Sequence, residues 1–537
     1  MVENIILNKI GDGTPVSTIW NTDGAHQDSQ EKPAHYEKAI TEVGFGKYNV
    51  MLILTLIPSA FATSFSTSTM SYVFPIAQCD LNLTLDNKGM LNSITYFGML
   101  SSGFLSGFLT DTLGRKKLMI YAFIFDGFVV IMCAFSKSFT YLTIVKFFEG
   151  FIENGGFAAV IAYTSEFNSA KFRPFIPLFN GIFVNSGAVV LPLMAWIIFT
   201  DSINISTFGG FIVLRSWNLF ILATAIPSLM AGFLYILLPE SPKFLMTVGK
   251  NDEALKTFNK MYKCNNGSTK GEYPIKALVD EPKLQGNEKL GHVTSQRSNI
   301  QALKEGFRQI AAIFYRPNCI NLIMVVIIQF GLLMGNNTLR LWLPQLFAAI
   351  NDRSEVAKKE GFDLCRTLQT LIPNSTRSNG TCSVNYNNSE VYANNAICGA
   401  VAIVILLLSL PMVRLLGKKI VLCGSALGSG LCLIIIAYYG NHITVTLTLS
   451  SIHIGFNYVA FNTLLSSIVD LFPTTLRAMA VASAMAFGRF GSSVGNIIFP
   501  ALLGIGCLYP FLTIGGIILV SAFLAMLLPD SDMKALK

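Results

Sequence analysis

Twelve largely apolar segments follow one another along the 537 residues of this chain. Each holds about 20 or more residues, enough for an α-helix to cross a hydrocarbon layer roughly 30 Å thick. The pattern predicts an all-α membrane protein with twelve transmembrane helices. We place them at about 48–75, 90–110, 118–136, 139–165, 174–200, 211–238, 318–343, 394–413, 420–439, 443–470, 478–503 and 507–528.

Basic residues gather in alternate short loops between these segments. Because Lys and Arg accumulate on the cytoplasmic side of membrane proteins, both termini and the long central loop are predicted to be cytoplasmic. The net charge of +8 then reflects orientation and contact with anionic lipid, and it does not indicate nucleic-acid binding. The loops concerned hold Arg115, Lys116 and Lys117; Lys171 and Arg173; Arg414, Lys418 and Lys419; and Arg477.

This topology divides the chain into five parts. Two six-helix halves, 48–238 and 318–528, follow a cytoplasmic segment at 1–47 and are separated by a cytoplasmic loop at 239–317. A short cytoplasmic tail covers 529–537. The second half includes an outer or luminal loop at 345–393. Composition agrees, since 52% of the residues are hydrophobic and only 13% are charged.

Glycosylation sequons mark the loops assigned to the outer side. They begin at Asn82, Asn204, Asn374, Asn379 and Asn387, and the last three lie within one loop. Cys365 and Cys382 flank that cluster in an oxidising compartment, so a disulfide between them is a candidate pairing. Cys79 and Cys398 compete as partners.

Several short motifs resemble the major facilitator superfamily. The turn at 107–117 has the acid, glycine and basic residues of that superfamily's loop between its second and third helices. The segments 239–245 and 470–477 resemble sugar and organic-ion porters. The segments 43–48, 79–90, 163–167 and 341–344 resemble the synaptic vesicle glycoprotein 2 group. The resemblance implies alternating access of two halves, with a cytoplasmic gate formed by Gly107, Asp111, Gly114, Arg115, Lys116, Asp470 and Arg477.

The sequence departs from these relatives at three points. The first helix has no acid, so we expect no proton or cation site there. Lys146 stands where many relatives have an arginine, which removes bidentate recognition by a guanidinium. The second-half turn at 415–419 keeps its glycine and positive charge but has no acid of its own.

Ionisable residues inside the apolar segments are the candidates for function, because a charge in the membrane interior is costly. Lys146, Glu149 and Glu153 lie three and four residues apart, hence on one helix face. We favour a substrate or proton site over a purely structural pair. Arg340 and Arg489 could meet an anionic solute or a carboxylate of the fourth helix, although Arg340 could instead extend to the outer interface. His453 is either a titrating group or a hydrogen-bonded core residue.

No sequence motif indicates catalysis or a cofactor. We find no phosphate-binding glycine loop, no metal-spaced Cys/His set and no nucleophile motif, so the protein is not expected to be an enzyme. In the long cytoplasmic loop, 251–262 and 300–314 have the pattern of surface helices, and 264–298 is expected to be flexible.

The functional hypothesis is transport of a small organic solute, charged or neutral, across a lipid bilayer by alternating access. The mechanism is a secondary carrier, coupled to a proton or cation, or a uniporter. The plasma membrane and an intracellular vesicle membrane both fit. The alternative is a membrane glycoprotein that keeps the fold and acts as a binding or trafficking partner.

If the sequon cluster is luminal, glycosidase treatment should increase the electrophoretic mobility of the natively expressed protein. Replacing Asn374, Asn379 and Asn387 together by Gln should remove most of that shift. A triple variant that shifts as much as the parent would contradict the assignment.

Overall fold

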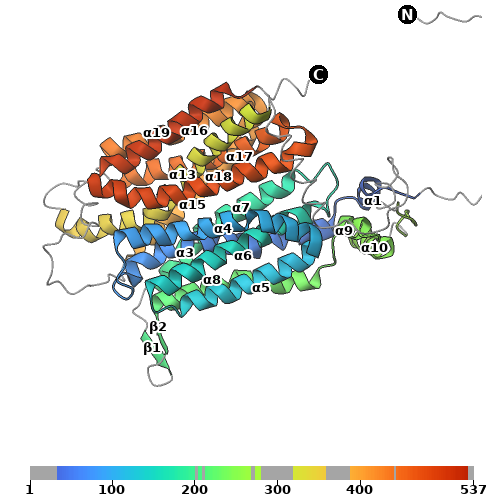
Figure 1. The fold of residues 1–537 in the computed structure, drawn as a ribbon, viewed down its shortest axis with the longest axis horizontal. Coiled ribbons are helices and arrows are strands. Elements are labelled where there is room, and N and C mark those ends of the chain that lie inside the picture. Colours follow the sequence, from blue (N-terminus) through green and yellow to red (C-terminus); the bar gives the residue numbers. More distant parts are fainter. Residues whose placement is uncertain are drawn as a thin grey trace, which may run out of the picture.

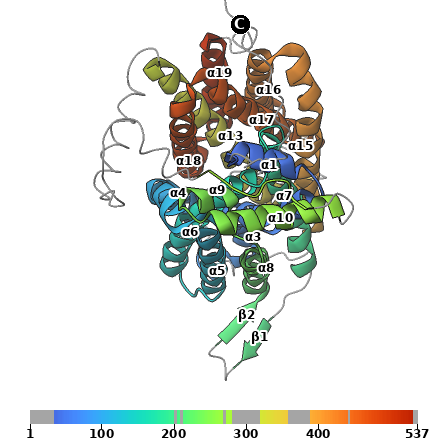
Figure 2. The same ribbon diagram turned by 90° about the vertical axis from the view of Figure 1, so that its right-hand side faces the viewer.

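The computed structural model describes residues 33–199, 204–207, 212–267, 272–279, 318–357, 388–440 and 443–529. The expected all-α architecture of two six-helix groups is confirmed, and Figures 1 and 2 show one group lying against the other. The first group contains α2 (Lys47–Leu54) with α3 (Leu56–Ala77), α4 (Leu85–Leu113), α5 (Arg115–Ala134), α6 (Phe139–Ser165), α7 (Phe175–Ile198) and α8 (Ser216–Leu237). The second contains α13 (Asn318–Ala357), α15 (Ser389–Leu416), α16 (Lys418–Tyr439), α17 (Ile443–Leu471), α18 (Thr474–Ile505) and α19 (Leu508–Leu527).

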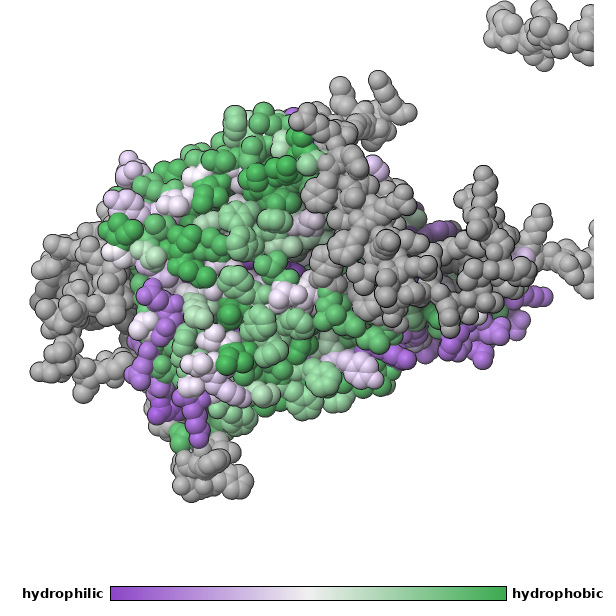
Figure 3. Space-filling view, in the orientation of Figure 1, coloured by the Kyte–Doolittle hydropathy of each residue, from purple (hydrophilic) through white to green (hydrophobic). Residues whose placement is uncertain are grey.

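Nine long helices in the described part of the chain are apolar enough to span a membrane by length and composition alone. The other three, α4, α6 and α18, are richer in small and charged residues. These helices tolerate small and charged residues because they pack against other helices of the protein. For example, α4 lies between α6 and α18. Figure 3 shows hydrophobic side chains over the sides of the molecule and polar ones toward its ends, as expected of a membrane-embedded surface.

Two predicted boundaries are wrong at the outer end. The seventh helix does not stop at 343: α13 continues through Pro344 to Ala357, because Leu346, Phe347 and Ile350 are buried in the second-half core. The segment between α13 and α15 therefore covers 358–388, which is shorter than the predicted loop at 345–393. Residues 212–215 are not helical either, since β1 (Asn204–Thr207) pairs antiparallel with β2 (Ile212–Arg215).

A small platform covers the other end of the first half, which is the end predicted to be cytoplasmic (Figure 1). It contains α1 (Tyr36–Val43), α9 (Pro242–Thr247) and α10 (Asn251–Asn266), with buried Phe258 and Met261 from α10. The Tyr273 hydroxyl donates to the Ala39 carbonyl of α1 at 2.7 Å. Burial raises the pKa of the Tyr36 hydroxyl, also on α1. The predicted helix at 251–262 is confirmed, α1 was not predicted, and 300–314 lies outside the described residues.

Glycines bring α4 and α6 into close contact. A Cβ on Gly98 would overlap the Phe147 carbonyl oxygen, and one on Gly150 would overlap the Thr95 carbonyl oxygen. Backbone oxygens cannot move aside as the end of a side chain can. The two helices therefore depend on glycine at these positions.

Gly98→Ala should destabilise the protein, because overpacking costs about 1–3 kcal/mol and exceeds the 0.5–1 kcal/mol that Ala gains over Gly in a helix. Gly103→Ala is the matched control on the same helix, since its Cβ would meet nothing within 4 Å. Thermal unfolding of both variants in detergent checks this. Equal midpoints would contradict the close-packing role.

Candidate functional site

The two halves meet at the outer end, which carries β1 and β2. Ser493 of α18 donates to the Ser93 carbonyl of α4 at 3.2 Å. The Lys88 amine donates to the Gln345 side-chain oxygen of α13 at 3.0 Å. A Cβ on Gly89 would lie 2.7 Å from the Asn496 carbonyl oxygen. These contacts from α4 to the second half close that end of the interface.

The same face of α4 is open toward the cytoplasmic end. Gly103 and Gly107 follow Gly89 by 14 and 18 residues, so at 3.6 residues per turn they lie on its face of the helix. Both are exposed, and a Cβ on either would meet nothing within 4 Å. Among the described residues, α4 therefore meets the second half at the end that carries β1 and β2, and not at Gly103 or Gly107.

A cavity of about 30 Å³ lies between the halves, large enough for one or two water molecules. Arg340 of α13 and Ser68 and Tyr72 of α3 contribute polar groups to it. The remaining lining residues are Ser71, Asn185, Ala188, Leu191, Leu341, Leu343, Asn395, Cys398, Gly399, Ile454 and Tyr458. The lining thus mixes one cation with hydroxyl, amide, aromatic and aliphatic groups.

Arg340 connects the two halves. Its Nη1 donates to Ser68 Oγ at 2.8 Å, and its Nη2 lies 3.5 Å from Thr67 Oγ1 and 3.4 Å from Asn337 Oδ1. Nε is buried without a hydrogen-bond partner. Because α13 extends well beyond residue 343, Arg340 sits mid-helix and does not reach for the outer interface.

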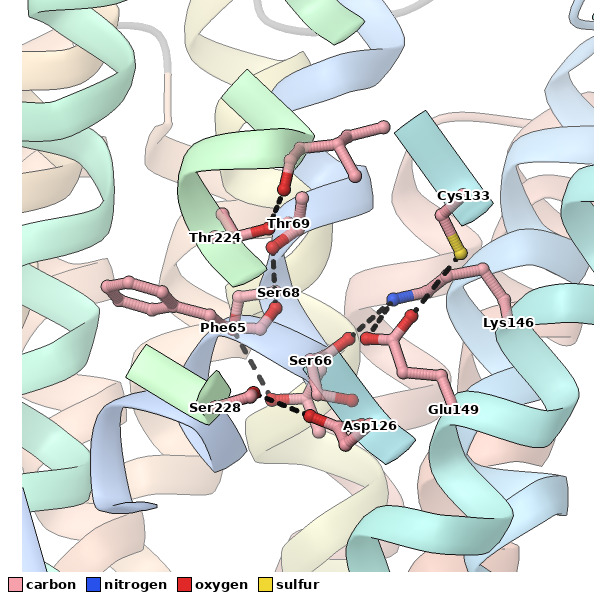
Figure 4. Close-up of polar contacts among 12 residues, drawn as sticks. Phe65, Ser66, Ser68, Thr69, Asp126, Cys133, Lys146, Glu149, Thr224 and Ser228 are labelled. Carbon is pink, nitrogen blue, oxygen red and sulfur yellow. Dashed lines mark hydrogen bonds and ion pairs between the residues drawn. The ribbon is translucent and has the colours of Figure 1, made fainter. Parts of the chain in front are cut away.

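Lys146 and Glu149 form an ion pair inside the first half, as Figure 4 shows. The Lys146 amine lies 2.7 Å from Glu149 Oε1 and donates to the Ser66 carbonyl at 2.9 Å. Cys133 Sγ lies 3.6 Å from the other Glu149 oxygen. Both charged side chains are only 2% exposed, so this pair is held by α3, α5 and α6 and does not line the cavity around Arg340.

Asp126 of α5 belongs to the same buried region. Ser228 of α8 donates to one of its carboxylate oxygens at 2.6 Å, and the other oxygen has no hydrogen-bond partner. The Ser228 hydroxyl comes from a helix 102 residues away in the sequence. No helical spacing or local motif joins these two residues.

Glu153 is separate from the Lys146 pair. Thr63 of α3 donates to its carboxylate at 2.5 Å, and Arg489 of α18 interacts with it electrostatically without an ion pair in the described part of the chain. His453 is fully buried, with its Nδ1 3.0 Å from the Ser429 hydroxyl and from the Ser429 carbonyl. The six predicted site residues therefore occupy four places and do not form one cluster.

The gate turn forms a polar cluster at the cytoplasmic end of the first half. Arg115 lies 3.3 Å from Glu166 and over the Phe244 ring, while the Lys116 N–H donates to Glu240 at 3.1 Å. Gly114 has φ +88°, and a Cβ there would lie 2.9 Å from the Phe244 ring, so glycine is required. The Asp111 side chain lies outside the description.

The second half repeats this arrangement. Gly417 has φ +85°, and the next residue, Lys418, forms an ion pair with Asp470 at the end of α17. The acid missing from the second turn is thus supplied by α17, and in the first half Glu166, which follows α6, pairs with Arg115 in a similar way. Arg477 donates from Nε to the Phe472 carbonyl at 3.0 Å.

Two of the predicted glycosylation positions fall on described residues. Asn82 is exposed between α3 and α4, and Asn204 begins β1. Asn374, Asn379 and Asn387 lie outside the described residues, and glycosylation remains a prediction throughout.

The state of two of the cysteines named in the disulfide prediction, Cys79 and Cys398, is described. Cys79 is disulfide-bonded, as is Cys507, which was not predicted. Cys398 is a free, buried thiol and is therefore not a competing partner. Cys365 and Cys382 lie outside the described residues. Among the described residues, no group of three or more His, Cys, Asp or Glu side chains could hold a metal ion.

Comparison with known families agrees with this architecture. The family described as "Sugar (and other) transporter" matches residues 48–357, and the family described as "Major Facilitator Superfamily" matches residues 381–536. The chain belongs to the major facilitator superfamily. It is an integral membrane protein of a transporter family and is not an enzyme.

Similar proteins span nearly the whole chain. Synaptic vesicle glycoprotein 2B from Homo sapiens is 22% identical and covers 95% of this chain and 87% of its own length. The partially occluded, inward-open xylose transporter XylE from E. coli is 15% identical with a TM-score of 0.64, covering 90% of this chain and 99% of its own. A D-xylose–proton symporter gives a TM-score of 0.61 at 15% identity, covering 90% of this chain and 98% of its own. These structures establish the fold alone.

Removing one member of the Lys146–Glu149 pair should destabilise the first half. Glu149→Gln or Lys146→Met leaves a buried charge unpaired, which costs about 3–5 kcal/mol, and the double variant should recover most of the loss. The exposed Lys250–Glu253 pair has the same spacing and is the control, where Glu253→Gln should cost under about 1 kcal/mol. Thermal unfolding in detergent checks all four variants. If the Glu149→Gln variant were as stable as the Glu253→Gln control, Lys146 would not depend on Glu149 for its stability in the first half.

Proposed function

We propose that the protein transports a small organic solute by alternating access, with the cavity around Arg340 as its central site. The observation that carries the proposal is that Arg340 of the second half hydrogen-bonds Ser68 of the first, inside a cavity between the halves. A solute bound there contacts both halves. Its binding energy can therefore change the relative stability of the two arrangements.

The contacts along α4 support an inward-facing state. Moving to the outward-facing state separates the outer-end contacts, including Lys88 with Gln345 and Ser493 with Ser93. It also brings the cytoplasmic ends together. In that state the cytoplasmic gate would hold these ends together through the Arg115 and Lys418 clusters. The same gate would include Gly107, Asp111, Lys116, Asp470 and Arg477.

We further propose that transport is coupled to protons. Three buried carboxyl groups, Asp126, Glu149 and Glu153, face two cations, Lys146 and Arg489. Full ionisation would leave uncompensated negative charge in the membrane interior, which is costly. Holding a proton on one carboxyl group removes that charge. Glu153 is the group that both α3 and the second half can influence, through Thr63 and Arg489.

Proton coupling predicts that a gradient drives accumulation. In vesicles containing the purified chain, a difference of about one pH unit can drive roughly tenfold accumulation at one proton per solute. Glu153→Gln keeps the hydrogen-bonding shape and removes the titrating charge, so it should reduce uptake to the level seen without a gradient. Glu253→Gln, on the exposed face of α10, should behave like the parent.

A screen with xylose, small carboxylic acids and small amines supplies the transported solute for that measurement. Full gradient-driven accumulation in a well-expressed Glu153→Gln variant would refute the coupling role. Saturable binding without uptake of any bound solute would refute transport. That result would favour the alternative of a membrane glycoprotein acting as a binding or trafficking partner.

A further inference from the structure

Arg340 carries a positive charge that no acidic side chain balances. All of its hydrogen bonds go to hydroxyl and amide oxygens, from Ser68, Thr67 and Asn337. No Asp or Glu among the described residues forms an ion pair with it. By contrast, Lys146 is paired with Glu149, and Arg489 interacts with Glu153. Of Lys146, Arg340 and Arg489, Arg340 is therefore the cation that lacks an acidic partner in the described part of the chain.

A cation held away from water is costly unless an anion or several strong dipoles compensate it. The dipoles around Arg340 do so only in part. The Nη1 bond at 2.8 Å is short, but the two Nη2 contacts are 3.4 Å and 3.5 Å, and Nε has none. The unsatisfied Nε–H and the weakly bonded Nη2, whose two contacts are both long, share one edge of the guanidinium. Two parallel donors on one edge are the geometry that a carboxylate accepts in bidentate fashion.

We propose that the solute is an organic anion whose carboxylate binds the Nε and Nη2 edge of Arg340. This inference rests on the proposed function and names its substrate class. The anion supplies the missing charge and satisfies the free Nε–H. Since Ser68 on α3 holds the opposite side of the same guanidinium, the bound anion fixes an arginine that already joins the halves.

The neighbouring groups indicate the rest of the ligand. The Tyr96 hydroxyl of α4 is buried beside Arg340 and within its electrostatic reach, and it meets no partner at full hydrogen-bond geometry, so it can donate to the same carboxylate. Tyr72, Tyr458, Leu191 and Ile454 give the cavity an aromatic and aliphatic lining. The ligand is therefore a carboxylate attached to a compact apolar body. The present volume admits only water, so that body enters when the halves move.

Benzoate and its neutral counterpart benzamide test the charge requirement, because they differ little in size. Equilibrium binding of each radiolabelled compound is measured on the purified full chain in lipid nanodiscs. We expect benzoate to bind about 10- to 100-fold more tightly than benzamide, the range for a hydrogen-bonded charge. Arg340→Gln should abolish that preference. Arg340→Lys keeps the charge but not the paired donors, and should retain only part of it.

Arg414→Gln is the matched control, because this exposed arginine at the cytoplasmic end of α15 lies outside the cavity. It should keep the full preference. Equal binding of benzoate and benzamide to the parent overturns the proposal without recourse to any variant. A preference that survives Arg340→Gln in a folded protein, judged by thermal unfolding, also overturns it.

Uptake measured on the same preparations separates this inference from the proposed function. Transport of a neutral solute with no benzoate preference would leave transport standing and refute the anion site. Arg340-dependent benzoate binding with no uptake of any solute would support the anion site and refute transport.

Discussion

Compensation of charge inside the hydrocarbon layer is the constraint on which this structure depends. A charged side chain in lipid requires a partner within the protein. The first half meets that requirement internally, because the Lys146 amine forms an ion pair with Glu149 and donates a hydrogen bond to the Ser66 carbonyl. These contacts join α3 to α6 and leave little freedom within the half. Arg340 meets it only in part, through contacts that cross between the halves.

Helix packing then separates rigid contacts from movable ones. On one face α4 is joined to α6 through Gly98 and Gly150, where backbone approaches backbone. On another face, near its outer end, it meets the second half through the Ser493 hydrogen bond and the approach of Gly89 to the Asn496 carbonyl oxygen. The contacts with α6 hold the half together, and those with the second half can break without disturbing it. This difference is what a rigid-body rocking motion requires.

The sequence predicted what depends on local pattern. Apolar runs located the twelve helices, and spacings of three and four placed Lys146, Glu149 and Glu153 on one face. Contacts between residues far apart in the sequence could not be predicted from local pattern. Asp126 and Ser228 meet only because α5 packs against α8, and Asp470 reaches Lys418 across 52 residues. The sequence predicted that the seventh helix ends at 343, just before Pro344. Burial of Leu346 and Phe347 extends α13 beyond this proline, so Arg340 lies in the middle of the helix.

The central claim is that the outer ends must separate during each transport cycle, and a cross-link across them tests it most directly. Ser93 and Ser493 lie in contact from opposite halves, so Ser93→Cys with Ser493→Cys places two thiols at the closed end. Oxidative cross-linking of this pair should abolish uptake in vesicles. Each single variant, treated in the same way, should remain active. Undiminished uptake by the fully cross-linked protein would contradict alternating access through this interface.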